Sequence, residues 1–439
     1  MYLNIKENKT SWSSDGTKYP TIEPHTKEKH LILEGYLKDW IVTLCANHPG
    51  NSSVLTIIDG FCGGGFYKDP ESKQVWEGSP VRILRVIDSA LQEVRERRSK
   101  PRFNLRIKVL FIDSEIQHTE CLKAFLNRLE DNHKFVKFNY EIITTEFSNI
   151  LDTCLEEVRK RGGSSFFFID PFGYTQFSML DIRKIMSLNK SEILLTFMID
   201  FVRRFLTSRS ESLRAFDNRM DAEGYFLKAS VDGMDTASQQ AYLRDETLRL
   251  FRDKGNVRYV YTFGMLRTST IVTYYLIHFA NHRRAQEVIK DTLWRYNNID
   301  LSYQFAYGIY GLGFRTPEYF EETLRLFDIK TENHKQCVID LQNGIIPLVH
   351  EHKEGVRFRD LVDLTIQMNP ANLDIYRDSI VKSREETELK VKRNGKESRA
   401  RYLKPDDIII KSNDRQYFFS RIWTNFIRNN FSVTMFVLS

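Results

Sequence analysis

The chain has 439 residues, of which 41% are hydrophobic and 13% aromatic, and its formal net charge is +6 at pH 7. Such a chain can bury a large core, which excludes a disordered or fibrous protein and predicts two domains or one elaborated domain. The weak positive charge favours an anionic partner without requiring one.

The cysteines and the apolar runs narrow the class of protein further. Five cysteines are widely spaced and form no CxxC pair: Cys45, Cys62, Cys121, Cys154 and Cys337. We therefore expect reduced thiols, with neither a disulfide framework nor a metal site. No apolar run approaches the roughly 20 residues of a membrane-spanning helix, and the polar start MYLNIKENK differs from a signal peptide. The expected location is the cytoplasm.

The N-terminal 24 residues are polar and are predicted to be flexible. Beyond them, apolar residues recur at helical spacing between residues 33 and 44, which predicts a helix packed on the body of the protein. Four basic residues lie at the start of this helix: His25, Lys27, Lys29 and His30. They can receive a carboxylate, a phosphate or a substrate, or they can simply form a solvated helix end.

The segment VLTIIDGFCGGG, residues 54–65, is a β-branched run that ends in Asp59 and then breaks into glycines. It predicts a buried strand that delivers a cofactor loop, because glycine lets the backbone approach a ligand without a Cβ. The alternative interpretation is that these glycines form only a tight turn. A helix is predicted directly after the turn-rich residues that follow, in SPVRILRVIDSALQEVRERR.

Further strands alternate with helices along the chain. They are predicted at residues 107–113, 138–144, 166–169 and 193–198. The first of these ends at Asp113 and Glu115, and the third ends at Asp170. In an open α/β sheet, ligands bind at the carboxyl edge of the strands, where these acids are expected to lie together.

Residues 203–253 interrupt this alternation and are predicted to be a helical insertion over the active edge. The runs VRYVYTFGM and TIVTYYLIHFA then read as an antiparallel hairpin. Late strands of this kind after five βα units are the layout of class I methyltransferases. We therefore predict, for residues 25–300, a Rossmann-like α/β core of the class I methyltransferase type, with a mostly parallel seven-stranded sheet.

The cofactor that this layout implies is S-adenosylmethionine (SAM). Glycines would give backbone space beside its amino-acid end, Asp59 would hold the ammonium group directly or through water, and Asp113 or Glu115 would accept the ribose hydroxyls. The form DGFCGGG is similar to the DxFxGxG loop common among nucleic-acid methyltransferases. The predicted cofactor residues are Asp59, Gly60, Phe61, Gly63, Gly65, Asp113 and Glu115.

The predicted catalytic residues follow the 166–169 strand: Asp170, Pro171, Phe172 and Tyr174. They resemble the (D/N)PP(Y/F) motif of amino-methyltransferases that act on nucleic-acid bases, in which an acid or amide and a carbonyl accept the two hydrogens of an exocyclic amine. The proline stiffens the turn and an aromatic ring stacks on the base. Phe172 replaces the second proline and Gly173 precedes Tyr174, so either aromatic can be the stacking one. The alternative is a plain strand-ending Asp-Pro turn.

Several segments together resemble the three-Cys-motif partner (TcmP) family. They occur in the family's order over roughly residues 20–300: PHTKEKH with YLKDW, IIDGFCGGG, FIDSE, FFIDPFGY, TFMIDFVRRF and HFANHRRAQEVIKDTLW. The resemblance implies a methyltransferase-like core and a partner protein that is similar to radical-SAM enzymes. The three cysteines of the family name belong to that partner. No established reaction comes with the resemblance.

The C-terminal third differs in pattern. Residues 301–334 are predicted to be a linker, 335–411 a winged-helix-like domain, and 412–439 a tail. The basic residues of the second helix and the wing would bind a nucleic-acid backbone. They include Arg377, Lys382, Arg384, Lys392, Arg393, Lys396 and Arg401. The alternative is that this domain contacts another protein and that its charged side chains are simply solvated.

Two functions remain open on the sequence. The first is a SAM-dependent methyltransferase that acts on an exocyclic amine of a DNA or RNA base, with the three-cysteine protein as partner. The second is a non-catalytic cofactor-binding or nucleic-acid-binding regulator of that partner.

Overall fold

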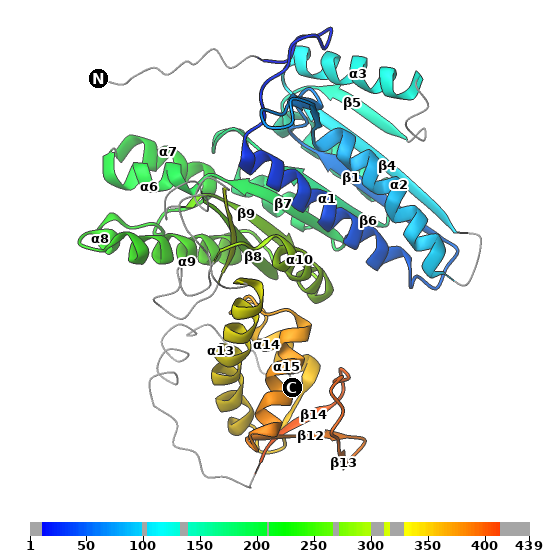
Figure 1. Ribbon diagram of the computed structural model, residues 1–439. Helices are drawn as coiled ribbons and strands as arrows, with labels where there is room; N and C mark the ends of the chain where they lie inside the picture. Colours follow the sequence, from blue (N-terminus) through cyan, green and yellow to red (C-terminus); the bar gives the residue numbers. More distant parts are fainter. Residues whose placement is uncertain are drawn as a thin grey trace. The chain divides into compact units, whose positions relative to one another are not determined.

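A computed structural model describes residues 11–98, 103–131, 139–208, 210–266, 272–299, 311–316 and 329–412. The chain divides into two compact units, Met1–Phe327 and Asp328–Ser439. Figure 1 shows the sheet and helices of each unit. The predicted tail, apart from residue 412, and most of the predicted linker lie outside the described residues.

An eight-stranded sheet forms the centre of the first unit, in the order β10-β8-β9-β7-β6-β1-β4-β5. Its strands are β1 (Ser52–Asp59), β4 (Asn104–Asp113), β5 (Tyr140–Thr144), β6 (Ser164–Ile169), β7 (Ser191–Phe197), β8 (Tyr259–Leu266), β9 (Val272–Ala280) and β10 (Leu312–Arg315). Only β9 runs antiparallel to its neighbours, β7 and β8. The predicted α/β fold, with a mostly parallel sheet and a late antiparallel hairpin, is confirmed.

The number of strands differs from the predicted seven. The additional strand, β10, comes from residues that the sequence places in a linker, and it pairs in parallel with β8. Four residues at the edge of a sheet are too few to produce a recognisable period-two pattern, which explains why the sequence does not reveal this strand.

Helices cover the sheet because their apolar stripes need a partner surface. They are α1 (Pro24–Cys45), α2 (Ser79–Arg97), α3 (Ile116–Asp131), α4 (Phe147–Arg161), α5 (Met179–Met186) and α10 (Arg283–Tyr296). Helix α1 packs against α2 and α10, and Figure 1 shows α1 and α2 side by side in front of the strands. The predicted stripe of α1, including Leu33, Tyr36, Leu37, Trp40 and Ile41, is buried.

The predicted insertion is helical. It comprises α6 (Ile199–Ser208), α7 (Ser210–Met220), α8 (Lys228–Val231) and α9 (Thr236–Lys254). It begins a few residues earlier than the predicted residue 203. Phe216 of α7 and Phe251 of α9 join the core cluster that continues into β7 and β9, so the insertion is anchored by aromatic side chains.

Part of the N-terminal segment that the sequence predicts to be flexible packs on the first unit. Trp12 is 7% exposed and Ile22 is 2% exposed, and Thr21 forms a parallel bridge with Lys68. A single tryptophan in a polar segment gives no periodic signal, so burial of this segment was not predictable from pattern. Residues 1–10 lie outside the described part.

The second unit alternates helices with short strands. Its elements are α13 (Ile329–Glu351), β11 (Val356–Arg357), α14 (Phe358–Thr365), α15 (Leu373–Glu385), β12 (Leu389–Arg393), β13 (Lys396–Glu397) and β14 (Ile408–Lys411). The strands form an antiparallel sheet in the order β11-β14-β12-β13. Leu361, Ile375, Ile380 and Ile409 are fully buried in this unit. Among the helices described in both units, none is long and apolar enough to cross a membrane.

Candidate functional site

Three carboxylates meet at one edge of the main sheet. Asp59 ends β1, Asp113 ends β4, and Asp170 directly follows β6; these strands are neighbours in the order β6-β1-β4. Asp59 is in register with Phe168 on one side and with Phe111 on the other. Parallel strands in register end together, so the acids that the sequence places at strand ends lie at one site.

Asp59 is the most deeply buried of the three. It is 0% exposed, and its Oδ1 accepts a hydrogen bond from the Phe61 N–H at 3.3 Å. Its Oδ2 is buried without a hydrogen bond of normal geometry to the described residues, although the nearby Ser79 hydroxyl favours the charged form. Burial, reinforced by the charges of Asp170 and Asp113, raises the pKa of Asp59 from 3.8 to about 7.

We expect Asp59→Asn to stabilise the protein at pH 8 but not at pH 4. Because the folded-state pKa is the higher one, the folded protein retains a proton that the unfolded chain loses, and the free energy of unfolding falls as pH rises from about 4 to 7. A shift of this size corresponds to at most roughly 4 kcal/mol. Urea denaturation at both pH values measures the difference. An equal effect at both pH values would contradict the raised pKa.

The glycine loop after β1 is held against side chains of the protein itself. A Cβ on Gly60 would lie 2.8 Å from the Phe147 ring, and one on Gly64 would lie 2.2 Å from the Trp12 ring. Gly63 and Gly65 have positive φ values of +59° and +86°, which glycine adopts without strain. The loop therefore needs its glycines for its turn and for close packing.

Trp12 covers this loop. Its indole Nε1 donates to the carbonyl of Phe66 at 2.7 Å, and its ring lies edge-on to Tyr67 and His118, with ring centroids 5.1 and 4.7 Å away. Trp12 is thus part of the site region, and sequence reasoning missed it. The only sequence signal is an isolated large aromatic in a polar segment.

Asp113 fixes the loop from the other side. Its Oδ2 accepts from the Gly63 N–H at 3.0 Å, and its Oδ1 accepts from the Glu115 N–H at 2.9 Å. The same Oδ1 lies 3.0 Å from Nδ1 of His118, which carries the proton because a carboxylate can only accept. The side chain of Glu115 is exposed. Of the two acids predicted for ribose hydroxyls, Glu115 therefore has the more available carboxylate.

Asp170 is paired with a lysine of α1. Lys29 Nζ lies 2.5 Å from Asp170 Oδ2, and the two side chains are 8% and 22% exposed. The ammonium group also lies 5.8 Å from the centroid of the Tyr274 ring on β9. Of the two readings of the basic helix start, solvated charge does not describe Lys29, because it is buried beside the predicted catalytic acid.

The aromatic residues of the predicted motif have different surroundings. Phe172 is 81% exposed, and its N–H donates to the side chain of Gln176 at 2.9 Å. Tyr174 instead packs edge-on to Phe205 and Phe216 under the helical insertion. A small pocket adjoins this cluster; its lining includes Pro171, Gly173, Tyr174, Leu195, Phe201 and Phe216. Phe172 is therefore the aromatic of this motif that can stack on an incoming ring.

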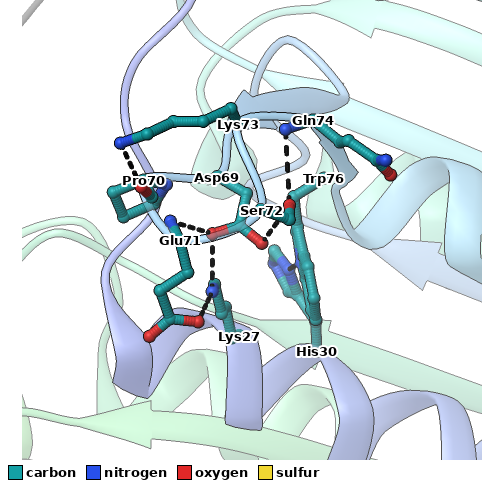
Figure 2. Close-up of polar contacts among 9 residues, drawn as sticks. All are labelled: Lys27, His30, Asp69, Pro70, Glu71, Ser72, Lys73, Gln74 and Trp76. Carbon is teal, nitrogen blue, oxygen red and sulfur yellow. Dashed lines mark hydrogen bonds and ion pairs between the residues drawn. The ribbon is translucent and has the colours of Figure 1, made fainter.

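A hairpin between the glycine loop and α2 closes over the start of α1. It consists of β2 (Phe66–Lys68) and β3 (Val75–Glu77). Figure 2 shows Lys27 of α1 reaching the hairpin turn, where its Nζ lies 2.7 Å from both Asp69 and Glu71. Trp76 Nε1 donates to Nδ1 of His30 at 3.2 Å. The Lys27 contact lowers the pKa of Asp69 to about 2, and burial lowers that of His30 well below its usual value.

The two ends of the hairpin meet. The N–H of Gly78 donates to the carbonyl of Gly65 at 2.8 Å. Between these glycines, the Tyr67 ring lies 5.1 Å from the Trp12 ring and 5.7 Å from the His30 ring, and burial and then the charges of Asp170, Asp59 and Asp113 raise its pKa above the ordinary value. Its hydroxyl therefore keeps its proton and can act as a donor. Tyr67 is a second site residue that the sequence did not indicate.

In the second unit, three of the predicted nucleic-acid-binding arginines hold the unit's own fold. Arg377 pairs with Asp374 at 2.6 Å and lies over the Tyr402 ring. Arg384 donates to the carbonyls of Ser398 and Ala400. Arg393 binds Asp407, whose side chain is 2% exposed, at 2.6 Å.

The remaining predicted basic residues are more available. Lys392, Lys396 and Arg401 are exposed, and Lys382 is half-buried. Lys392 and Lys396 lie on β12 and β13, and Arg401 lies in the segment between β13 and β14. The exposed members of the predicted nucleic-acid-binding set therefore lie on the β12–β13 turn and the segment that follows it.

No protein-family model and no curated protein matches the chain.

Proposed function

We propose that the protein is a SAM-dependent methyltransferase that acts on an exocyclic amine of a nucleic-acid base. The observation that carries the proposal is the meeting of Asp59, Asp113 and Asp170 beside the glycine loop, at the carboxyl ends of three neighbouring parallel strands. The sheet order supports it, because five parallel strands followed by the antiparallel β8–β9 pair resemble the class I methyltransferase layout.

The charge of the edge favours this cofactor over a phosphate-bearing one. Asp170 is paired with the buried ammonium group of Lys29, and the charges of Asp170 and Asp113 both act on Asp59. A sulfonium and an ammonium group are stabilised by such a field, whereas a pyrophosphate is repelled. Asp59 would hold the ammonium group and Glu115 the ribose hydroxyls, each hydrogen bond to a charged group contributing about 1.5 to 3 kcal/mol.

The acceptor would lie at Asp170. Its Oδ2 binds Lys29, which leaves Oδ1 to accept a hydrogen of the amine, while the exposed Phe172 ring stacks on the base. Holding the amine hydrogen directs the nitrogen lone pair toward the methyl group. SAM would supply the methyl group: the carbon–nitrogen bond would form as the carbon–sulfur bond breaks, the sulfur would keep the bonding electron pair, and the nitrogen would pass one proton to Asp170 Oδ1.

Titration calorimetry with SAM tests the cofactor. We expect binding of SAM and of S-adenosylhomocysteine, and weaker binding of SAM to Glu115→Ala. Methyl transfer is measured with labelled SAM and mixed DNA and RNA, with and without the three-cysteine partner that the TcmP resemblance implies. No binding at millimolar SAM would exclude the enzymatic function.

The second unit would hold the nucleic acid as a winged-helix-like domain. Its order of helix, strand, two helices and three strands supports this assignment. The exposed Lys392, Lys396 and Arg401 would contact phosphates, whereas Arg393 is committed to Asp407.

Replacing Lys392, Lys396 and Arg401 together by glutamine should flatten the salt dependence of nucleic-acid binding. Three lost phosphate contacts lower the slope of log K against log salt by about 2 to 3. Arg393→Gln is the matched control: it should leave the slope nearly unchanged and lower the melting temperature, because Asp407 loses its partner. Filter binding over a salt series measures the slope, and an unchanged slope in the triple variant would favour protein contact.

One observation favours the second candidate, a non-catalytic regulator of the three-cysteine protein. Trp12 packs directly on Gly63 and Gly64, so the protein's own side chain takes one approach to the glycine loop. If SAM does not bind to the wild type, this packing predicts that SAM binds to Trp12→Ala. A variant that also fails to bind SAM would show that Trp12 is not what keeps the cofactor out.

A further inference from the structure

We infer that Lys29 and Asp170 together form a recognition site for an amidine edge, meaning an amino group beside an unprotonated ring nitrogen. The inference rests on the proposed function and deepens it, since it assigns the specificity of the acceptor site to a residue of α1. Adenine and cytosine both present such an edge, whereas uracil and thymine do not.

Lys29 is nearly buried and has hydrogen-bond donors to spare. An ammonium group has three N–H donors, and across the described part of the chain its one polar contact is Asp170 Oδ2, at 2.5 Å. Its side chain is only 8% exposed, and the Tyr274 ring lies 5.8 Å away. A nearly buried ammonium group with donors left over is costly unless a further acceptor binds it.

The position of Lys29 is fixed by its neighbours on the helix. Lys27 and His30 bind the hairpin turn and Trp76, as Figure 2 shows. Farther along α1, Trp40 Nε1 donates to Glu192 at 2.9 Å. Because both ends of this part of α1 are anchored, Lys29 presents its donors at one place relative to Asp170.

Lys29 and Asp170 together place a hydrogen-bond donor beside an acceptor. Asp170 Oδ1 is an acceptor for an amine hydrogen, and the adjacent ammonium group is a donor for an atom next to that amine. An acceptor beside a donor complements an amidine, whose amino group is bonded to the carbon that also carries the ring nitrogen. Lys29 thus supplies a contact that Asp170 alone cannot make. A uracil edge offers no amine to Asp170, so it lacks the group that the proposed transfer would methylate.

Nucleoside analogues test this directly by ligand-observed NMR with the full-length protein. Purine riboside lacks the amine of adenosine and 1-deazaadenosine lacks the ring nitrogen of its amidine, whereas 7-deazaadenosine keeps both. We expect adenosine and 7-deazaadenosine to bind about ten- to a hundredfold more tightly than purine riboside and than 1-deazaadenosine. Cytidine and 3-deazacytidine provide the same contrast for cytosine.

Substitution at Lys29 assigns the contrast to that residue. Lys29→Met should bind adenosine and 1-deazaadenosine equally, and Lys29→Arg should keep the preference for adenosine to within a few-fold. Lys38→Met is the matched control, since Lys38 lies on the same helix with its side chain 43% exposed; it should behave as the wild type. If Lys29→Met does not fold, the comparison of cytidine with 3-deazacytidine on the wild type decides the question, because cytidine does not share the adenosyl group of the proposed cofactor.

The outcomes separate this inference from the proposed function. A wild type that binds neither nucleoside in preference to its analogues, or a folded Lys29→Met that keeps the preference, overturns the amidine site; Lys29 is then only an anchor for α1. An intact preference without SAM binding overturns the methyltransferase and leaves the amidine site standing. SAM binding without the preference overturns the amidine site and leaves the methyltransferase proposal standing.

Discussion

Asp170→Ala should lower the rate of methyl transfer by about a hundredfold or more while changing the affinity for SAM less than about twofold. The carboxylate orients the amine and makes no cofactor contact in the proposed arrangement, so the loss falls on transfer alone. Single-turnover transfer with labelled SAM measures the first quantity and calorimetry the second. Equal losses in both would mean that Asp170 belongs to the cofactor site.

A control is required because Asp170 also neutralises Lys29. Alanine leaves an ammonium group with an 8% exposed side chain unpaired, and breaking a buried pair costs about 3 to 5 kcal/mol. Asp170→Asn keeps one acceptor oxygen and the side-chain volume, so it should retain more stability and more transfer. Thermal unfolding of both variants separates loss of folding from loss of chemistry.

Gly64→Ala should strongly destabilise the first unit. The added Cβ would lie 2.2 Å from the Trp12 ring, so either the indole or the loop must move, at a cost of about 1 to 3 kcal/mol. In the Trp12→Ala background the same substitution should be nearly neutral. A double-mutant cycle by urea denaturation measures the coupling. Additive effects would show that Gly64 is needed for another reason.

The part of the fold that the sequence predicts well is the one governed by short-range patterning. The run from Phe166 to Ile169 is apolar throughout, as expected for a strand buried on both faces, and all four residues are buried. Because neighbouring parallel strands end at one edge, acids at strand ends could be placed together without coordinates. The meeting of Asp59, Asp113 and Asp170 follows from that rule.

The part that could not be predicted depends on contacts between distant residues. Lys29 and Asp170 are 141 positions apart, and no local pattern states which acid a lysine will meet. Trp12 reaches the loop at Gly64 for the same reason. In the second unit, Arg393 and Lys392 are adjacent in sequence, yet only Arg393 is bound to Asp407. A cluster of basic residues in the sequence therefore predicts that a surface is positively charged. It does not predict which of the side chains are free to bind a ligand.

The hydrogen bond between Gly78 and Gly65 brings the two ends of the β2–β3 hairpin together. The residues between them form a hairpin whose two ends are held together. A longer or shorter turn therefore does not change the distance between Gly65 and Gly78. A spectroscopic label on the exposed side chain of Lys73, which has a positive φ of 59°, would leave Asp69 and Glu71 in contact with Lys27. Such a label would report on movement of the start of α1, where Lys29 meets Asp170.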